Sequence, residues 1–469
     1  MRSRCVYALI ACAAVLCDVA YADELVAPRL VGMGQAGAAA AWGLDALGTN
    51  PSMMGRNVRT IAFSLYPFSG TVVPVFALGH ATTSRFTSAD LDLLLARLAV
   101  GNLSDVDKGR IVDAVDLAGL TVRTEGMIAA MVLPLGSDHT IGVHVAQRGA
   151  GKYTLMDGMD SVAHNVAVSG NVFPLLLRTP VTAEGVWFNE YAASYAYSPV
   201  DERGAMDFGV GVTVKFVQGL GHVRVDSKRL STISLGSNPI TGTSIQTAVD
   251  YDVRTANGGR FDANTLPVDP LFSLFPKGVG SGAGADIGLM KTIVVGRQLL
   301  TAALSVTDIG EIRWSTSPAV RSVHRMDTIQ TGGLFFAVDS LKQYEGKSVA
   351  ADAYSTSLPT RLHLAVALED AAPSGILPNL ATFEYAQGLT DAVGNPTTPR
   401  IAAGAEWRKN AWHWSTGLSF SADESVSWSV GGGLQLFNHL DVQAAFGRVN
   451  GLWENPMLVN AAARLALTY

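Results

Sequence analysis

The sequence lacks any apolar run of about eighteen residues after its N-terminus, so it does not cross a bilayer with a helix. Charged residues are scarce, at 16%, whereas 48% of the residues are apolar and the mean hydropathy is +0.24. An apolar chain without a spanning helix is typical of a membrane β-barrel, because strand alternation spreads the apolar residues out.

Cysteine is confined to a segment that we expect to be removed. Residues 1–22 are typical of a secretory signal, with Arg2 and Arg4 before an apolar core and an A-x-A cleavage site at residues 20–22. All three cysteines lie in this signal, so a mature chain starting at Asp23 has neither a disulfide nor a thiolate metal site. A lipoprotein signal ending at Cys12 would leave an apolar core of about six residues, which is shorter than usual.

Basic residues are also fewer than acidic ones. Without the signal, the chain has 32 basic and 39 acidic residues, a net charge of −7, which excludes a nucleic-acid-binding protein. The nine histidines are scattered and form no H-E-x-x-H motif, and there is no G-x-S-x-G elbow or P-loop. We therefore expect no enzyme, no cofactor and no metal site.

Apolar and small polar residues alternate along most of the chain. In residues 457–469 one face carries apolar residues and ends in Tyr469, while the other carries small residues and Arg464. A period of two over about ten residues is the pattern of a tilted strand between lipid and a polar interior. The ranges with this pattern predict fourteen antiparallel transmembrane strands: 58–79, 121–133, 140–150, 186–198, 206–219, 283–294, 300–314, 360–369, 376–387, 399–408, 411–420, 425–437, 438–448 and 457–469.

The links between these ranges alternate between short and long, as periplasmic turns and external loops do. The long link 80–120 predicts a helical insertion after the first strand, and the link 220–282 predicts an external loop with its own hairpin. The even strand count puts Tyr469 at the periplasmic rim, where we expect it to act as the assembly signal. Residues 58–469 would then form the barrel domain.

Charged residues on the polar face of the strands are the candidate lumen residues. The strongest are Arg361, Arg400, Glu406 and Arg464, followed by Glu369, Asp441, Asp286 and Lys215. One interpretation is a mutually neutralising network that braces the wall and holds a plug. The alternative is that an arginine, such as Arg400 or Arg464, binds a ligand carboxylate through two hydrogen bonds.

Residues 23–57 differ from the strands, because they are rich in Gly and Ala and do not alternate. The composition predicts a compact plug, with a short helix around Ala36–Trp42 that ends near Gly43, rather than a disordered terminus. The Asn50-Pro51 pair predicts an extended or turn geometry.

The segment LVGMGQAGAAAAWGLDALGTNPSMMGR, residues 30–56, resembles the N-terminal hatch signature of FadL-type outer-membrane barrels, which include long-chain fatty acid transporters and PorV-like proteins. The matching positions are Gly32, Gly34, Gly37, Asp45, Asn50 and Pro51, while Gln35 and Ser52 depart from the pattern. The resemblance implies a Gram-negative outer-membrane barrel with an internal hatch. It also implies that apolar ligands enter from outside and leave through a lateral opening once the hatch moves.

Three hypotheses about function follow. The first is passive uptake of hydrophobic small molecules, with a kinked strand such as 376–387, which contains Pro378, as the lateral exit. The second is a PorV-like component that binds secreted or surface proteins, and the third is a structural barrel. The expected partners are membrane lipid, the barrel-assembly machinery, an apolar ligand and, in the second hypothesis, secreted proteins.

Overall fold

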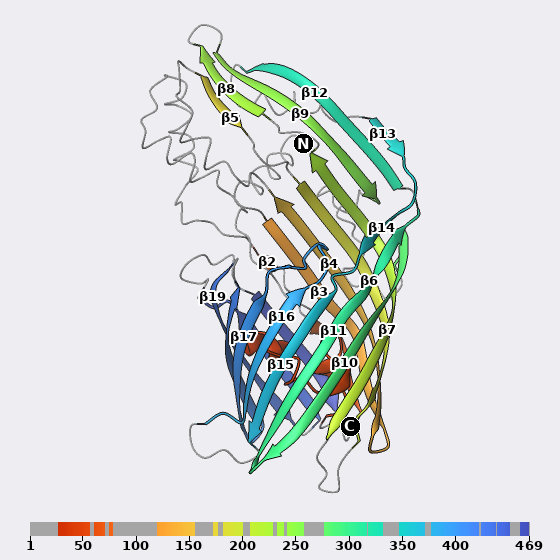
Figure 1. Cartoon of the computed structure of the whole chain (residues 1–469), viewed down its shortest axis with the longest axis vertical. Coiled ribbons are helices and arrows are strands. Elements are labelled where there is room, and N and C mark those ends of the chain that lie inside the picture. Colours follow the sequence, from red (N-terminus) through yellow and green to blue (C-terminus); the bar gives the residue numbers. More distant parts are fainter. Residues whose placement is uncertain are drawn as a thin grey trace.

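The computed structural model of the chain describes residues 27–56, 61–70, 75–77, 120–154, 172–176, 182–199, 207–227, 232–238, 242–257, 276–316, 318–331, 347–370, 377–421, 424–437, 439–450 and 460–468. Within these residues, 21 strands form one antiparallel sheet (Figure 1). No helix in the described ranges is long and apolar enough to cross a membrane. The expected signal, the helical insertion at 80–120 and Tyr469 lie outside the described residues.

Most of the sheet is made of long strands that follow one another in space. In the order of pairing they are β1 (Ala62–Gly70), β3 (Leu120–Leu135), β4 (His139–Thr154), β6 (Thr182–Tyr197), β7 (Phe208–Ser227), β10 (Gly280–Val295), β11 (Gln298–Trp314), β15 (Arg361–Asp370), β16 (Leu380–Gly388), β17 (Arg400–Lys409), β18 (Trp412–Ser421), β19 (Glu424–Leu436), β20 (Leu440–Gly447) and β21 (Asn460–Thr468). Each pairs with the next, and β21 pairs with β1. We call them the wall strands, and each overlaps one range that the sequence predicts.

The remaining strands extend the sheet at one end, as Figure 1 shows for β8, β9, β12 and β13. They are β2 (Val75–Ala77), β5 (Val172–Leu176), β8 (Thr232–Asn238), β9 (Gly242–Ala256), β12 (Pro318–Thr331), β13 (Lys347–Ala350) and β14 (Tyr354–Ser357). Strands β8 and β9 form a hairpin within residues 220–282, and β9 also pairs with the last residues of β7 and with β12. We call these strands, β14 excepted, the outer extension.

Burial alternates along the wall strands as the sequence predicts. On β7, Val212, Val214 and Phe216 are 42–64% exposed, whereas Thr213 and Lys215 are buried. The same alternation on neighbouring strands gives the sheet a broad apolar outer face and an inner face of small, polar and charged residues. An exposed apolar surface of this size indicates contact with a nonpolar phase.

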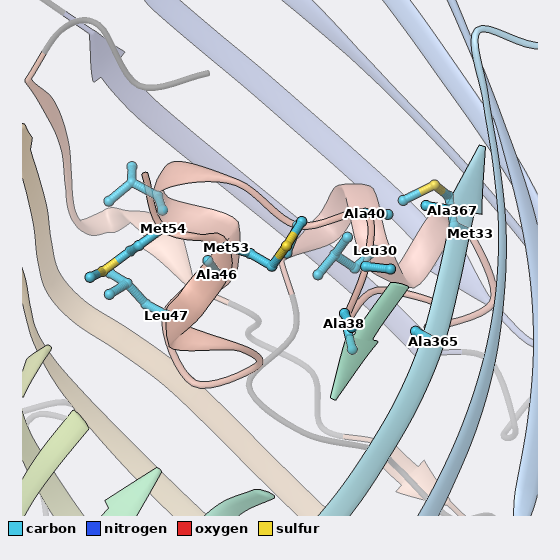
Figure 2. Packing of buried hydrophobic residues seen from close by; sticks show 14 of the residues in the cluster. Leu30, Met33, Ala38, Ala40, Ala46, Leu47, Met53, Met54, Ala365 and Ala367 are labelled. Atoms are coloured by element: carbon cyan, nitrogen blue, oxygen red, sulfur yellow. The ribbon is translucent and has the colours of Figure 1, made fainter. Parts of the chain in front are cut away.

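The N-terminal segment, residues 27–56, packs against the wall strands and is almost entirely buried. It contains helix α2 (Pro28–Gly32) and two 3-10 turns, η1 (Gly43–Ala46) and η2 (Pro51–Met53). Figure 2 shows its Leu30, Met33, Met53 and Met54 in one apolar cluster, which also includes alanines of β15.

The helix predicted around Ala36–Trp42 is wrong. The helical turn comes earlier, because Pro28 starts α2, and Gly34 and Gln35 then adopt left-handed φ values of 67° and 66° that end it. Gly43 begins η1 rather than ending a helix. The expectation for Asn50-Pro51 is confirmed, since Asn50 is extended (φ −153°) and caps η2 by accepting a hydrogen bond from the Ser52 amide at 3.1 Å.

Candidate functional site

Wall glycines allow the N-terminal segment to touch the backbone of the strands. A Cβ on Gly417 of β18 would lie 2.1 Å from the Met33 carbonyl carbon, and one on Gly211 of β7 would lie 2.3 Å from that of Pro51. In real structures a Cβ atom essentially never lies within 3.0 Å of a non-bonded heavy atom. The segment is therefore packed against the wall without a gap at these two positions.

The motif residues make this packing possible. A Cβ on Gly32 would lie 2.8 Å from the Gly431 Cα, and one on Gly37 would lie 2.7 Å from Leu30 Cδ1. The Asn50 amide donates to the Ala38 carbonyl at 3.0 Å, which ties the middle of the segment to its C-terminal part. The motif thus reflects close packing and an internal hydrogen bond.

Ion pairs join the segment to the inner face of the wall. Arg29 lies 3.3 Å from the Asp45 carboxylate and also pairs with Glu406 of β17. Arg464 of β21 contacts the same Asp45 carboxylate at 2.5 Å. Burial opposes ionisation of Asp45, but Arg464 and Arg29 outweigh it and lower the pKa of its carboxyl.

Arg29 and Arg408 also approach the Trp42 ring, with guanidinium carbons 3.5 and 4.4 Å from its centroid. These cation–π contacts add to the ion pairs at the same end of the segment.

Arg400 of β17 hydrogen-bonds the turn that ends α2. It donates to the Gly34 carbonyl at 3.2 Å and to the Gln35 side chain at 2.8 Å. Nearby, Glu384 of β16 accepts a 2.7 Å hydrogen bond from the Ala38 amide. Gln35, which departs from the family motif, is therefore a contact of the wall.

Three of the four strongest predicted lumen charges, Arg400, Glu406 and Arg464, thus contact the N-terminal segment. Arg361 of β15 instead donates a 3.2 Å hydrogen bond to Asn395, in the link between β16 and β17. All four are turned to the inner face, and their role as ligand contacts stays a prediction.

A second group of charges lies farther along the inner face, on strands β3, β4, β6, β7, β10 and β11. We call it the ion network, and its members are Glu125, Arg148, Glu190, Lys215, Asp286 and Asp308, each at most 5% exposed. Lys215 contacts Asp308 at 2.6 Å, Asp286 at 2.8 Å and Glu190 at 3.3 Å. Arg148 contacts Glu125, Asp308 and Glu190 at 2.9–3.0 Å.

The ion network contains four carboxylates and only two permanent cations. The Asp286 Oδ2 atom has no hydrogen-bond partner among the described residues, although its Oδ1 accepts from the Asp308 amide at 2.7 Å. His144 adds a hydrogen bond to Glu190 at 2.9 Å. Within the ion network as the described residues define it, acidic side chains therefore outnumber the permanent cations.

Irregular backbone forms this region. The β10–β11 register shifts between Ala285 and Ile287, and on β11 Asp308 and Gly310 have φ values of 55° and 156°. The Leu358 amide bonds to the Gly310 carbonyl at 2.9 Å, where β14 gives way to β15. The bulge turns Asp308 toward Lys215 and Arg148, which strict alternation alone would not predict.

Above the ion network lies an inner cavity of about 210 Å³. Glu125 and Arg148 line it, as do Glu184 and Arg224 at the far ends of β6 and β7. Its apolar lining comes from Phe188, Ile312, Leu358 and Val393. The cavity thus combines a compact apolar wall with ionised groups.

Strand β7 contacts the N-terminal segment, the ion network and the inner cavity, so it shows their order along the wall. Gly211 touches the N-terminal segment, Lys215 lies in the ion network and Arg224 lines the inner cavity. A strand rises about 3.3 Å per residue, so along β7 the cavity begins roughly 25 Å from the segment, at Gly219 opposite Phe188, and ends roughly 40 Å from it, at Arg224. A bulge near Leu220 changes the alternation, so that His222 is buried where Val214 and Phe216 are exposed.

An apolar groove of about 590 Å³ lies on the outer face of β3, β4, β6 and β7. Met131, Val143, Val214 and Phe216 line it, together with small alanines of β3 and β6. His144, whose side chain is buried on the inner face, also borders this groove. The β3–β4 register also shifts beside it, between Met127 and Ala129.

Pro378 does not kink a wall strand. It precedes β16, which begins at Leu380. The prediction that Pro378 lies within a strand spanning 376–387 and kinks it is therefore wrong. Proline cannot donate to a strand ladder and is found at strand starts for this reason. The register shifts among the wall strands are instead in the pairs β1–β21, β3–β4, β6–β7, β10–β11 and β18–β19.

The described residues contain no group of three or more His, Cys, Asp or Glu side chains arranged to hold a metal ion. Sequence reasoning missed Glu125, Arg148, Glu190 and Asp308. The signal was present for Arg148, because it shares the inward register of residues 140–150 with His144. The inward orientation of Asp308 could not be predicted without knowing that β11 contains a bulge.

Comparison with solved structures returns the group of proteins that the N-terminal motif resembles. The toluene transporter TbuX of Ralstonia pickettii is 13% identical, with coverage of 94% of this chain and 97% of that chain and a TM-score of 0.43. A FadL homologue of Pseudomonas aeruginosa is 12% identical, with coverage of 96% and 99% and a TM-score of 0.44. The toluene transporter TodX of Pseudomonas putida is 10% identical, with coverage of 96% and 98% and a TM-score of 0.38.

Two of these descriptions name toluene transporters and the third names a FadL homologue. The TM-scores are too low for the likeness to carry an argument about mechanism. No curated protein matches the chain. The family model described as a family of unknown function, DUF5723, matches residues 176–440, and the chain belongs to that family.

Proposed function

We propose that this protein is a closed, fourteen-stranded barrel in the outer membrane of a Gram-negative bacterium, that the N-terminal segment is its hatch, and that it takes up small molecules passively. The strongest support is the set of pairings, which runs through the fourteen wall strands and returns from β21 to β1. The broad apolar outer face supports a lipid environment. The barrel-assembly machinery would insert such a chain.

The inner cavity is the entry site in this proposal. It opens among residues at the ends of β6 and β7 that lie away from the short turns, on the side of the outer extension. A solute from outside would meet Glu184 and Arg224 first and the apolar residues Phe188 and Ile312 next. An apolar body would be held there while its polar group stays hydrated or paired.

The N-terminal segment closes the path beyond the ion network, so it must move or the solute must leave sideways. The outer groove over β3, β4, β6 and β7 is the candidate lateral exit, because small alanines thin the wall there and the β3–β4 register shifts beside it. In this state His144 and Lys215 lie behind the groove, so the exit is closed.

Uptake in cells tests the proposal. A deletion strain, the complemented strain and a strain with Ala392→Trp would be given a panel of labelled small aromatic solutes. Ala392 lines the inner cavity, and a tryptophan there would fill it. We expect uptake of at least one solute to fall in the deletion strain, to recover on complementation and to stay low with Ala392→Trp. Equal uptake of every solute by all three strains would rule the proposal out.

A PorV-like role is the second candidate, and the outer extension favours it. Strands β8, β9, β12 and β13 continue the sheet beyond the wall strands (Figure 1) and offer a surface to a protein partner. Secreted or surface proteins recovered in stoichiometric amounts by affinity purification, and lost on removal of β8–β9, would support it. Recovery of chaperones and assembly factors alone would count against it.

A further inference from the structure

We propose that the inner cavity selects a small organic cation, namely a primary ammonium group on a compact apolar body. This inference rests on the proposed uptake function and names its substrate class. Three observations carry it: the volume of the cavity, its apolar wall, and the excess of carboxylates beside and beneath it.

The volume limits the solute to a small one. A cavity of about 150 Å³ in another protein holds benzene, so about 210 Å³ suits one aromatic ring with a short side arm. The apolar lining of Phe188, Ile312 and Leu358 lies on elements β6, β11 and the start of the link to β15, and it would contact the ring. A long acyl chain would not fit within this space.

The ion network sets the charge of the floor. Its four carboxylates share two cations, because Lys215 and Arg148 each contact three carboxylates and Glu190 and Asp308 contact both cations. Glu125, which lines the cavity directly, therefore shares Arg148 with two other acids. A low-dielectric wall focuses such an excess of negative charge into the cavity.

At the mouth of the cavity, too, the described carboxylates outnumber the described cations. Arg224 and its cross-strand neighbour Arg254 are the described cations there. The Arg224 Nε donates to both carboxylate oxygens of Asp226, at 3.0 and 2.9 Å, and the Arg254 guanidinium carbon lies 5.2 Å from the Tyr354 ring centroid. Glu184 lies 3.6 Å from Arg224 and is hydrogen-bonded to His222 at 3.1 Å. Asp391 adds an exposed carboxylate to the lining. An ammonium group can pair with Glu184 or Asp391, whereas a carboxylate would have to compete with the acidic side chains already present for the arginines.

Binding to the purified, full-length protein in detergent tests the proposal. Three probes of nearly equal size are titrated by calorimetry: 2-phenylethylammonium, 2-phenylethanol and phenylacetate. We expect the ammonium compound to bind about tenfold more tightly than the alcohol, and phenylacetate to show no saturable binding. Phenylacetate binding as tightly as the ammonium compound, or no ammonium binding, would overturn the inference.

Variants locate the effect. Asp391→Asn and Glu184→Gln should each lower the affinity for 2-phenylethylammonium about threefold to tenfold and leave that for 2-phenylethanol unchanged. Asp352→Asn is the matched control, because this exposed carboxylate lies at the same end of the barrel outside the cavity lining. An effect of Asp352→Asn equal to that of Asp391→Asn would contradict recognition in the cavity. A normal heat-shifted band on gels confirms folding of each variant.

Failure of the inference and failure of the proposed function give different results. If the substrate class is wrong, cells still lose uptake with Ala392→Trp, but the affected solutes are neutral or anionic. If the uptake function is wrong, Ala392→Trp changes no uptake at all, whatever the purified protein binds.

Discussion

Lys215 is the side chain whose removal should cost the most stability. It is 1% exposed and contacts Asp308, Asp286 and Glu190 at 2.6–3.3 Å. Lys215→Met preserves most of the volume but leaves the four carboxylates with one cation. Removing one partner of a buried ion pair costs about 3–5 kcal/mol, and we expect a loss of this size in the free energy of unfolding.

Asp286→Asn is expected to act in the opposite direction. It removes one of the surplus negative charges, keeps an oxygen for Lys215 and the Asp308 amide, and replaces the oxygen that has no partner in the described structure. We expect its unfolding free energy to equal or exceed that of the wild type. The double variant should recover part of the loss caused by Lys215→Met, because the two positions are in contact.

Urea unfolding in detergent micelles, followed by tryptophan fluorescence, measures these differences. With a slope of about 2–3 kcal/mol per molar urea, Lys215→Met should lower the midpoint by about 1–2 M. Lys291→Met is the control, because Lys291 pairs with Asp207 at 2.5 Å but is 53% exposed, and such pairs contribute at most about 1 kcal/mol. If Asp286→Asn destabilised the protein as much as Lys215→Met, the argument for an excess of acid would be refuted.

The remaining predictions concern the N-terminal segment and assembly. Gly211→Ala should destabilise the protein and loosen the segment in limited proteolysis, because its Cβ would overlap Pro51, whereas Gly151→Ala, with its nearest atom at 3.9 Å, should do neither. Asp45→Asn should cost stability above about pH 4, and the difference from the wild type should shrink as the pH falls through the lowered pKa of Asp45; a cost that is constant down to pH 2 would contradict the ion pairs. Deletion of Tyr469 should reduce the heat-modifiable form in outer-membrane fractions, and an unchanged amount would remove its assembly role.

The sequence alone predicts the wall well, because alternation over about ten residues records which side of each strand meets which environment. It places Arg400, Glu406 and Arg464 on the inner face for the same reason. It also predicts that residues 30–56 are compact, since a run of glycine and alanine without charge repulsion can pack closely. The helix at Ala36–Trp42 failed because propensity does not show that Gly34 and Gln35 adopt left-handed conformations against the wall.

The inner cavity and the ion network were beyond sequence reasoning for a different reason. Asp308 faces inward only because β11 bulges, and His222 is buried only because the alternation of β7 changes near Leu220. A shift of one residue exchanges the two faces of a strand, so alternation read across a bulge gives the wrong face. The partners Lys215 and Asp308 are also 93 residues apart, and nothing local links them.

In the proposed function, a solute passes through a barrel that its N-terminal segment closes. Uptake with that segment locked in place tests this passage directly. Ser305 of β11 donates to the Thr49 carbonyl at 2.9 Å, so the two residues are adjacent. Thr49→Cys and Ser305→Cys together place a cysteine pair there for oxidation, in a mature chain that we expect to have no other cysteine. We predict that uptake of the solute lost on deletion falls to the deletion level when the pair is oxidised and returns on reduction. Each single cysteine variant should behave as the wild type. Equal uptake in the oxidised and reduced states, with the cross-link verified on gels, would show that the solute does not pass the N-terminal segment.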